Sequence, residues 1–195
     1  MKQNEEQVNV AQLSELENEL NRVTYNSRFR SLLRSTIYTL IVVAASAVLV
    51  AVLFMPVLRI YGSSMSPTLE EGDIVISIKG SKIQQGDIVG VYYGSKLLMK
   101  RCIAYQQQWV DIDSSGNVYV DGELLDEPYL EEKAFGECNI ELPYQVPDNS
   151  LFVMGDHRSS SVDSRNTAVG CIDRDNVVGR IVFRVWPLSK FGPMN

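Results

Sequence analysis

The chain contains little histidine and cysteine, which limits the metal chemistry it can support. Of its 195 residues, one is histidine and three are cysteine. No two cysteines stand in a C-x-x-C pair, so a zinc cage is not expected. An exported domain could oxidise two of Cys102, Cys138 and Cys171, but sequence alone does not pair them. We favour the alternative in which these cysteines remain reduced and their thiols are buried.

Basic charge is also scarce. The formal net charge is −6 and the sequence pI is about 4.9, so the charge pattern typical of nucleic-acid binding is absent. The sequence shows no internal repeat, no low-complexity tract and no glycine-rich phosphate loop. Its length fits one domain with attachments.

The chain does contain a long uncharged apolar run, from Thr36 to Leu58. A helix of roughly 20 apolar residues spans a bilayer core, and a single span in hydrocarbon must be helical. The run is too long for a cleavable signal peptide and begins too far into the chain. An uncharged buried core helix of this length would be rare in so small a domain. We therefore expect an uncleaved transmembrane anchor over residues 36–58.

The charges beside this run predict its orientation. Four arginines precede it closely and only Arg59 follows, so the positive-inside rule makes residues 1–35 a cytoplasmic tail and residues 59–195 extracytoplasmic. Within the tail, Leu13, Leu16, Leu20 and Val23 have helical spacing. This pattern fits either a partner-binding amphipathic helix or a partly disordered tail, and we favour the tail.

Beyond residue 58 the pattern becomes one of short β-like runs separated by turn residues. Two hairpin signals stand out, Ser114–Asn117 and Asp121-Gly122. No helical stretch of comparable strength follows the anchor. We therefore predict a mainly β domain, a folded sheet or barrel. The expected strands cover residues 74–78, 88–93, 97–105, 109–112, 118–120, 151–154 and 177–186.

Ser64 is a candidate nucleophile because it stands in a Gly/Ser/Pro turn directly after the apolar run. His157 is the one histidine available to activate it, so a Ser-His-Asp triad is formally open. Asp156 is poorly placed to orient His157, since neighbouring side chains in extended backbone point apart. Another aspartate could do so, and the triad is the less favoured reading.

Lys100 is the alternative base. A lysine with an ordinary pKa is protonated at neutral pH, and burial among apolar neighbours would lower that pKa. In a strand, Leu98, Cys102 and Ala104 would share its face. A solvated edge lysine is an equally good reading of the spacing. Arg101 would point to the opposite face, where it could pair with a carboxylate.

A third polar stretch, residues 155–165, follows an apolar strand. It can be read as a surface loop or as a hydrogen-bonded support for the site. A hydroxyl would suit a neutral lysine, because it fixes the amine without adding charge.

These features resemble the type I signal peptidases, membrane-anchored serine proteases of the Ser/Lys kind, in their short Gram-positive-like, single-span form. The resemblance covers about four-fifths of the chain and excludes its first thirty or so residues. Four family boxes occur in order behind the anchor. They are Ser64-Met65-Ser66-Pro67-Thr68-Leu69, Gly86-Asp87-Ile88-Val89, Lys100-Arg101, and Gly155-Asp156-His157-Arg158-Ser159-Ser160-Ser161-Val162-Asp163-Ser164-Arg165.

The resemblance implies a role for each matched residue. Ser64 would be the nucleophile and Lys100 the general base, with Ser161 orienting the lysine amine. Supporting positions would be Gly155, Asp156, Arg158, Asp163 and Arg165, and the nucleophile and oxyanion loop would include Gly62, Ser63, Met65 and Pro67. The chain departs from the family at two positions. His157 replaces the usual asparagine, and Gly62 stands where some members supply a serine hydroxyl, so backbone N–H groups would form most of the oxyanion hole.

The implied protein is a mainly β, two-lobed signal-peptidase-type domain with one N-terminal transmembrane helix. It would remove signal peptides from exported preproteins, in contact with membrane lipid and the export machinery, without a metal, a cofactor or nucleic acid. One alternative is a catalytically idle homologue acting in secretion or pilus assembly, which would be expected to lack the serine or the lysine. A self-cleaving repressor-type Ser/Lys protease and a tethered β binding module fit less well.

Overall fold

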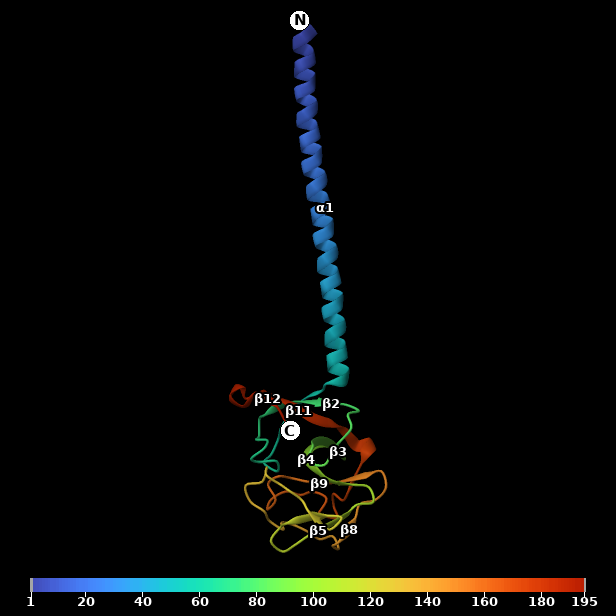
Figure 1. Cartoon of the computed structure of the whole chain (residues 1–195), viewed down its shortest axis with the longest axis vertical. Coiled ribbons are helices and arrows are strands. Elements are labelled where there is room, and N and C mark those ends of the chain that lie inside the picture. The colour runs from blue at the N-terminus through green and yellow to red at the C-terminus, as the bar shows by residue number, and fades with distance from the viewer. Residues whose placement is uncertain (1, 195) are drawn as a thin grey trace. The chain divides into compact units, whose positions relative to one another are not determined.

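The chain forms two compact units, residues 1–50 and 51–195. The computed structural model describes the backbone of residues 2–194 and the side chains of residues 22 and 24–194. The first unit is helical, and the second carries all of the β-structure in the described residues (Figure 1).

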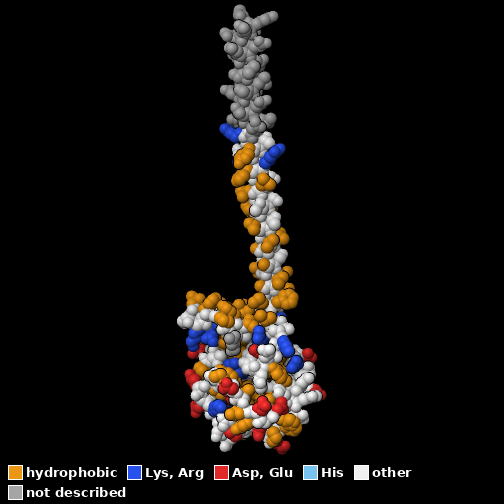
Figure 2. Space-filling view, viewed as in Figure 1, with side chains coloured by type: hydrophobic (Ala, Val, Ile, Leu, Met, Phe, Trp, Pro, Cys, Tyr) orange, Lys and Arg blue, Asp and Glu red, His pale blue; other side chains and the backbone are white. Residues whose placement is uncertain are grey.

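Helix α1 (Lys2–Phe54) contains residues 36–54 of the predicted anchor. Its Thr24–Phe54 part is long and apolar enough to cross a membrane, and Figure 2 shows hydrophobic side chains along it. The helix ends at Phe54, before the predicted boundary at residue 58. Pro56 explains the difference, because proline lacks an N–H donor and disfavours helical backbone in the residue before it.

The preference for a partly disordered tail is wrong for the backbone, because residues 2–35 continue the same helix. This stretch contains no proline or glycine and is rich in strong helix formers such as Glu, Gln, Leu and Arg. A helix already formed in the apolar segment can also extend without a new nucleus. The side chains of the predicted apolar stripe lie outside the described residues, so its role as a partner surface stays a prediction.

The mainly β prediction is confirmed, and all pairings are antiparallel. The larger sheet has the strand order β1-β2-β11-β3-β4-β9-β10, with β12 also pairing with β11, and the smaller has the order β7-β6-β5-β8. The larger contains β1 (Val57–Arg59), β2 (Ile74–Ile78), β3 (Ile88–Tyr93), β4 (Lys96–Tyr105), β9 (Ser150–Met154), β10 (Ile172–Asp173), β11 (Val177–Trp186) and β12 (Gly192–Pro193). The smaller contains β5 (Trp109–Ile112), β6 (Val118–Val120), β7 (Glu123–Leu124) and β8 (Tyr144–Gln145). Two short 3-10 helices flank β11, η1 (Arg174–Asn176) and η2 (Leu188–Lys190).

Both predicted hairpins are present. Strands β5 and β6 pair across the Ser114–Asn117 loop, and β6 pairs with β7 across Asp121-Gly122. Asp121 and Gly122 have φ values of 53° and 84°, the positive values that a two-residue turn of this hand requires.

Strand β4 pairs with different neighbours along its two halves. Residues 96–101 pair with β3, whereas residues 101–105 pair with β9. The pairing with β9 shifts register between Cys102 and Ala104. Ala104 therefore does not share the strand face on which it was predicted to lie with Lys100 and Cys102. Cys102 joins the cluster of Val89 and Val153, and Ala104 joins the one that packs under the smaller sheet. A register shift of this kind is typical of a β-bulge.

The loop of residues 62–69, here called the nucleophile loop, joins β1 to β2 over a third hydrophobic cluster. Met65 and Leu69 are buried in that cluster with Val75 and Ile181. A hydrogen bond from Leu69 N to Met65 O (2.8 Å) closes a turn that sends both side chains inward. The loop is therefore fixed from below by apolar packing, while Ser64 remains half-buried.

We predict that Leu69→Ala lowers the free energy of unfolding by about 2–5 kcal/mol, because it leaves a cavity under the nucleophile loop. The measurement is chemical denaturation of the full chain in detergent. Leu124→Ala is the control, since Leu124 is 58% exposed and its removal should cost less than about 0.5 kcal/mol. Equal losses in the two variants would contradict this account of the loop.

Candidate active site

Ser64 lies at the turn of the nucleophile loop, beside a cavity of about 40 Å³. Gly62 has a φ of 80°, which a residue with a side chain adopts only at a cost. The Ser64 carbonyl accepts a hydrogen bond from His157 N (3.1 Å), so the loop is tied to the 155–165 segment. The walls of the cavity are mixed, with the apolar side chains of Ile60, Leu98 and Met99 beside polar groups such as that of Arg59.

Lys100 is buried in the middle of β4, with 3% of its surface exposed. Its Nζ donates a hydrogen bond to Ser161 Oγ at 3.0 Å. Burial lowers the pKa of Lys100 below its ordinary value of 10.5, and the charge of Arg165 adds to this, while Asp163 and Asp156 oppose it. Of the two readings that the spacing left open, the solvated edge lysine is therefore wrong.

The 155–165 segment lies against both predicted catalytic residues, so it is not a surface loop. Asp163 accepts hydrogen bonds from Gly155 N (3.0 Å) and from Arg165 Nε (2.9 Å). Burial alone would raise the pKa of Asp163, but the hydrogen bond and charge of Arg165 lower it. Ser161 also contributes to lowering the pKa of Asp163, so this serine lies close to both the aspartate and Lys100.

Gly155 marks the closest approach of this segment to the nucleophile loop. A Cβ atom built on Gly155 would clash with the Ser64 carbonyl oxygen and with Ser161 Oγ. Glycine is needed here for space, because its φ is not in the left-handed region. The Ser64 backbone and the Ser161 hydroxyl thus approach the same point. Among the described residues no hydrogen bond joins Ser64 Oγ to Lys100 Nζ, a contact that often tightens only when substrate binds.

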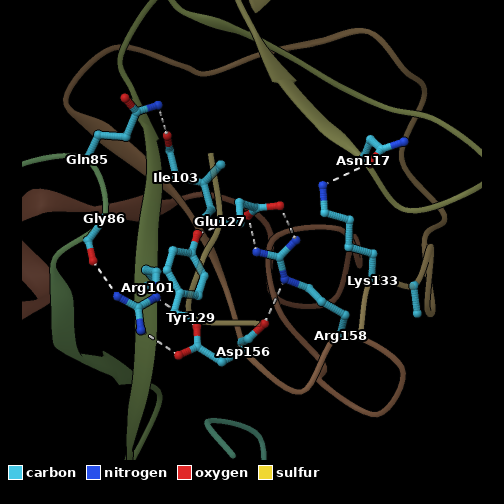
Figure 3. Close-up of polar contacts among 12 residues, drawn as sticks. Gln85, Gly86, Arg101, Ile103, Asn117, Glu127, Tyr129, Lys133, Asp156 and Arg158 are labelled. Carbon is cyan, nitrogen blue, oxygen red and sulfur yellow. Dashed lines mark hydrogen bonds and ion pairs between the residues drawn. The ribbon is translucent and has the colours of Figure 1, made fainter. Parts of the chain in front are cut away.

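Arg101 points away from Lys100, as the strand alternation predicts, and pairs with Asp156. Its Nε donates to Asp156 Oδ1 at 2.8 Å, and its Nη1 donates to the Gly86 carbonyl. The guanidinium also stacks 3.7 Å from the ring centroid of Tyr129 (Figure 3).

The sequence gives no sign of two further members of this network, Glu127 and Tyr129. Glu127 is buried and forms an ion pair with Arg158, while the Tyr129 hydroxyl donates to Glu127 at 2.9 Å (Figure 3). Arg158 Nε in turn donates to the Gly155 carbonyl at 3.1 Å. Both residues lie in a turn around Pro128, closed by a hydrogen bond from Leu130 N to the Glu127 carbonyl (3.2 Å). The proline could have indicated the turn, but no local pattern records which arginines these two side chains meet.

Among residues 24–194, the side chains of the histidine and the cysteines are not part of this hydrogen-bonded network. The His157 side chain is exposed and, among the described residues, forms no hydrogen bond with Ser64 and none with an aspartate, so the triad alternative gains no support. All three cysteines are free thiols, and burial raises the pKa of Cys102 to about 12 and that of Cys171 to about 11. No group of three potential metal ligands gathers in the described part of the chain.

We predict that Glu127→Ala destabilises the protein by about 3–5 kcal/mol, because it leaves the Arg158 guanidinium buried without its carboxylate. The unfolding midpoint in urea measures this. Glu70→Ala is the matched control, since it breaks the exposed pair with Lys190 and should barely change the midpoint. Comparable shifts in both variants would show that the Glu127 pair is not a buried anchor.

Three relatives show what this chain is similar to. It is 37% identical over 147 residues to probable signal peptidase I-1 of Synechocystis, covering 67% of this chain and 71% of the relative. It is 34% identical over 153 residues to signal peptidase IB of Staphylococcus aureus, covering 68% and 78%. It is 34% identical over 168 residues to thylakoidal processing peptidase 1 of Arabidopsis thaliana, of whose length it spans about half (48%), with 75% of this chain covered.

The family described as "Signal peptidase, peptidase S26" matches residues 33–186, which include the nucleophile loop, Lys100 and the whole 155–165 segment. With this match and relatives more than 30% identical, the chain belongs to the signal peptidase S26 family.

Proposed function

We propose that this protein is a membrane-anchored serine endopeptidase that removes signal peptides from exported preproteins with a Ser64/Lys100 dyad. One observation carries the proposal. Lys100 Nζ is held in the protein interior by Ser161, and Ser161 Oγ and the Ser64 backbone converge on Gly155. Such burial keeps the amine able to accept a proton at a pH where an exposed lysine would not.

The chemistry is acyl transfer in two halves. Neutral Lys100 takes the proton of the Ser64 hydroxyl, and Ser64 Oγ bonds to the scissile carbonyl carbon while backbone N–H groups stabilise the oxyanion. The carbon–nitrogen bond then breaks, and Lys100 gives its proton to the leaving amine. In the second half Lys100 accepts a proton from water, the resulting hydroxide attacks the acyl group, and Ser64 recovers its proton from Lys100.

Ser161 would orient the base without charging it. Its oxygen accepts an N–H from Lys100, and its own proton is free to point toward the nearby Asp163 carboxylate. The nitrogen lone pair of a neutral Lys100 is then left free for another proton donor, which in this mechanism is Ser64. A carboxylate in place of Ser161 would instead favour the protonated amine.

The edge of β4 offers a place for the substrate backbone. Residues 97–99 pair with β3 on one side, whereas the pairing with β9 begins only at Arg101. An extended peptide can add as a strand to the free edge, with its acyl side at the small cavity beside Ser64. At about 40 Å³ the cavity suits an alanine-like side chain.

The remaining parts of the proposal concern the membrane. Within Thr24–Phe54, the uncharged part from residue 36 onward would be the anchor, with the tail of residues 1–35 in the cytoplasm and the catalytic domain outside, near lipid and the export machinery. The idle-homologue alternative is less favoured, because the serine and the lysine are both retained and the lysine is buried with its partner.

We expect Ser64→Ala and Lys100→Ala each to reduce cleavage of a preprotein by about 10³-fold or more, because each removes a group that acts in the transition state. The full chain is assayed in neutral detergent. Ser114→Ala and Lys96→Ala are matched controls on the exposed surface and should retain wild-type rates. Retained cleavage in either active-site variant would exclude the dyad.

The rate should also depend on pH through Lys100. Only the deprotonated amine acts as the base, so kcat/KM should rise with pH through a pKa below the ordinary lysine value of 10.5 and then level off. Lys96→Ala should leave the profile unchanged. A rate independent of pH between about 6 and 9 would contradict a titrating lysine base.

A further inference from the structure

A second cavity, of about 140 Å³, adjoins the nucleophile loop and plays no part in the chemistry above. Ser66 and Pro67 form one wall, and residues 156–159 form another. The third wall is Glu131, Glu132 and Ala134. The larger cavity is therefore lined from the second residue after Ser64 onward, whereas the smaller cavity is lined by residues 59–62, by Ser64 and Met65, and by β4.

The third wall belongs to a segment, residues 127–135, that is held firmly although it contains no helix or strand. Three arginines of the site anchor it. Arg158 pairs with Glu127, Arg101 stacks on Tyr129, and Arg165 Nη1 donates to the Phe135 carbonyl at 2.8 Å. Anchors at both ends fix the position of the intervening residues beside the nucleophile loop, so the cavity has a defined shape.

The charge of this wall is negative and uncompensated. Glu131 and Glu132 are exposed, and neither is in an ion pair within the part of the chain that the structure describes. The neighbouring cation, Lys133, turns away and donates to Asn117 Oδ1 at 2.9 Å (Figure 3). On the facing wall, Asp156 and Arg158 are already paired with Arg101 and Glu127.

A peptide whose scissile carbonyl is attacked by Ser64 extends in both directions from that residue, and both cavities adjoin the loop that carries it. If its acyl side occupies the smaller cavity, the residues after the scissile bond can leave past Ser66 and Pro67, which line the larger cavity. We propose that this cavity binds the first residues of the released chain, and that Glu131 and Glu132 make it favour cationic over acidic side chains there. The inference rests on the proposed peptidase function and adds a charge preference on the leaving side.

The preference is tested with two preproteins that differ only at the second residue after the cleavage site, lysine in one and glutamate in the other. The full-length enzyme is assayed in a neutral detergent, so that membrane charge does not contribute. We expect kcat/KM to be about three- to tenfold higher for the lysine substrate, as for exposed charge pairs, and the ratio to fall in high salt.

Substitutions of the two glutamates test whether the difference in kcat/KM between the substrates arises in this cavity. Glu131→Gln with Glu132→Gln should bring the ratio close to one, and Glu131→Lys with Glu132→Lys should invert it. The control removes two glutamates outside the cavity, Glu123→Gln with Glu141→Gln, and should preserve the wild-type ratio.

The outcomes separate the two proposals. If wild type cleaves both substrates equally, or if the ratio survives in the Glu131 and Glu132 variants, the charge preference is wrong while the peptidase function stands. If wild type cleaves neither substrate, the peptidase function fails and the preference fails with it.

Discussion

The proposed chemistry depends on the contact between Lys100 Nζ and Ser161 Oγ, made where water does not reach. A buried amine beside a free carboxylate would keep its proton, because the opposite charge stabilises the cation. Here the nearby carboxylate of Asp163 is bound by Arg165 and by a backbone N–H, and burial is the dominant influence on Lys100. The hydroxyl of Ser161 holds the amine in place without restoring its charge.

Around this contact the protein buries an unusual amount of paired charge. The pairs Arg101–Asp156, Arg158–Glu127 and Arg165–Asp163 are almost fully enclosed. Buried ion pairs add little net stability, since the loss of hydration offsets most of their attraction. Their effect here is geometric. Arg101 also donates to the Gly86 carbonyl and Arg165 to the Phe135 carbonyl, while Arg158 reaches Glu127, 31 positions away. Segments far apart in sequence are thereby held in one arrangement.

The strands could be predicted because a half-buried strand repeats every two residues, and the long run at residues 177–186 coincides with β11. The strand order could not, since it follows from contacts between distant segments. The register shift after Cys102 likewise depends on its pairing with β9. Burial of Lys100 was undecided in sequence because its partner, Ser161, comes 61 positions later. Glu127 and Tyr129 matter only through the arginines that they meet in the folded chain, which no local pattern records.

The close packing around Gly155 helps to decide which homologous sequences encode an intact site. A side chain at this position would force the Ser64 carbonyl and the Ser161 hydroxyl apart. A homologue that keeps both reactive residues but has lost this glycine would therefore have a displaced catalytic geometry. Surveys of genomes that look only for the serine and the lysine would count such a degenerate copy as functional, and the glycine is the position that reveals it.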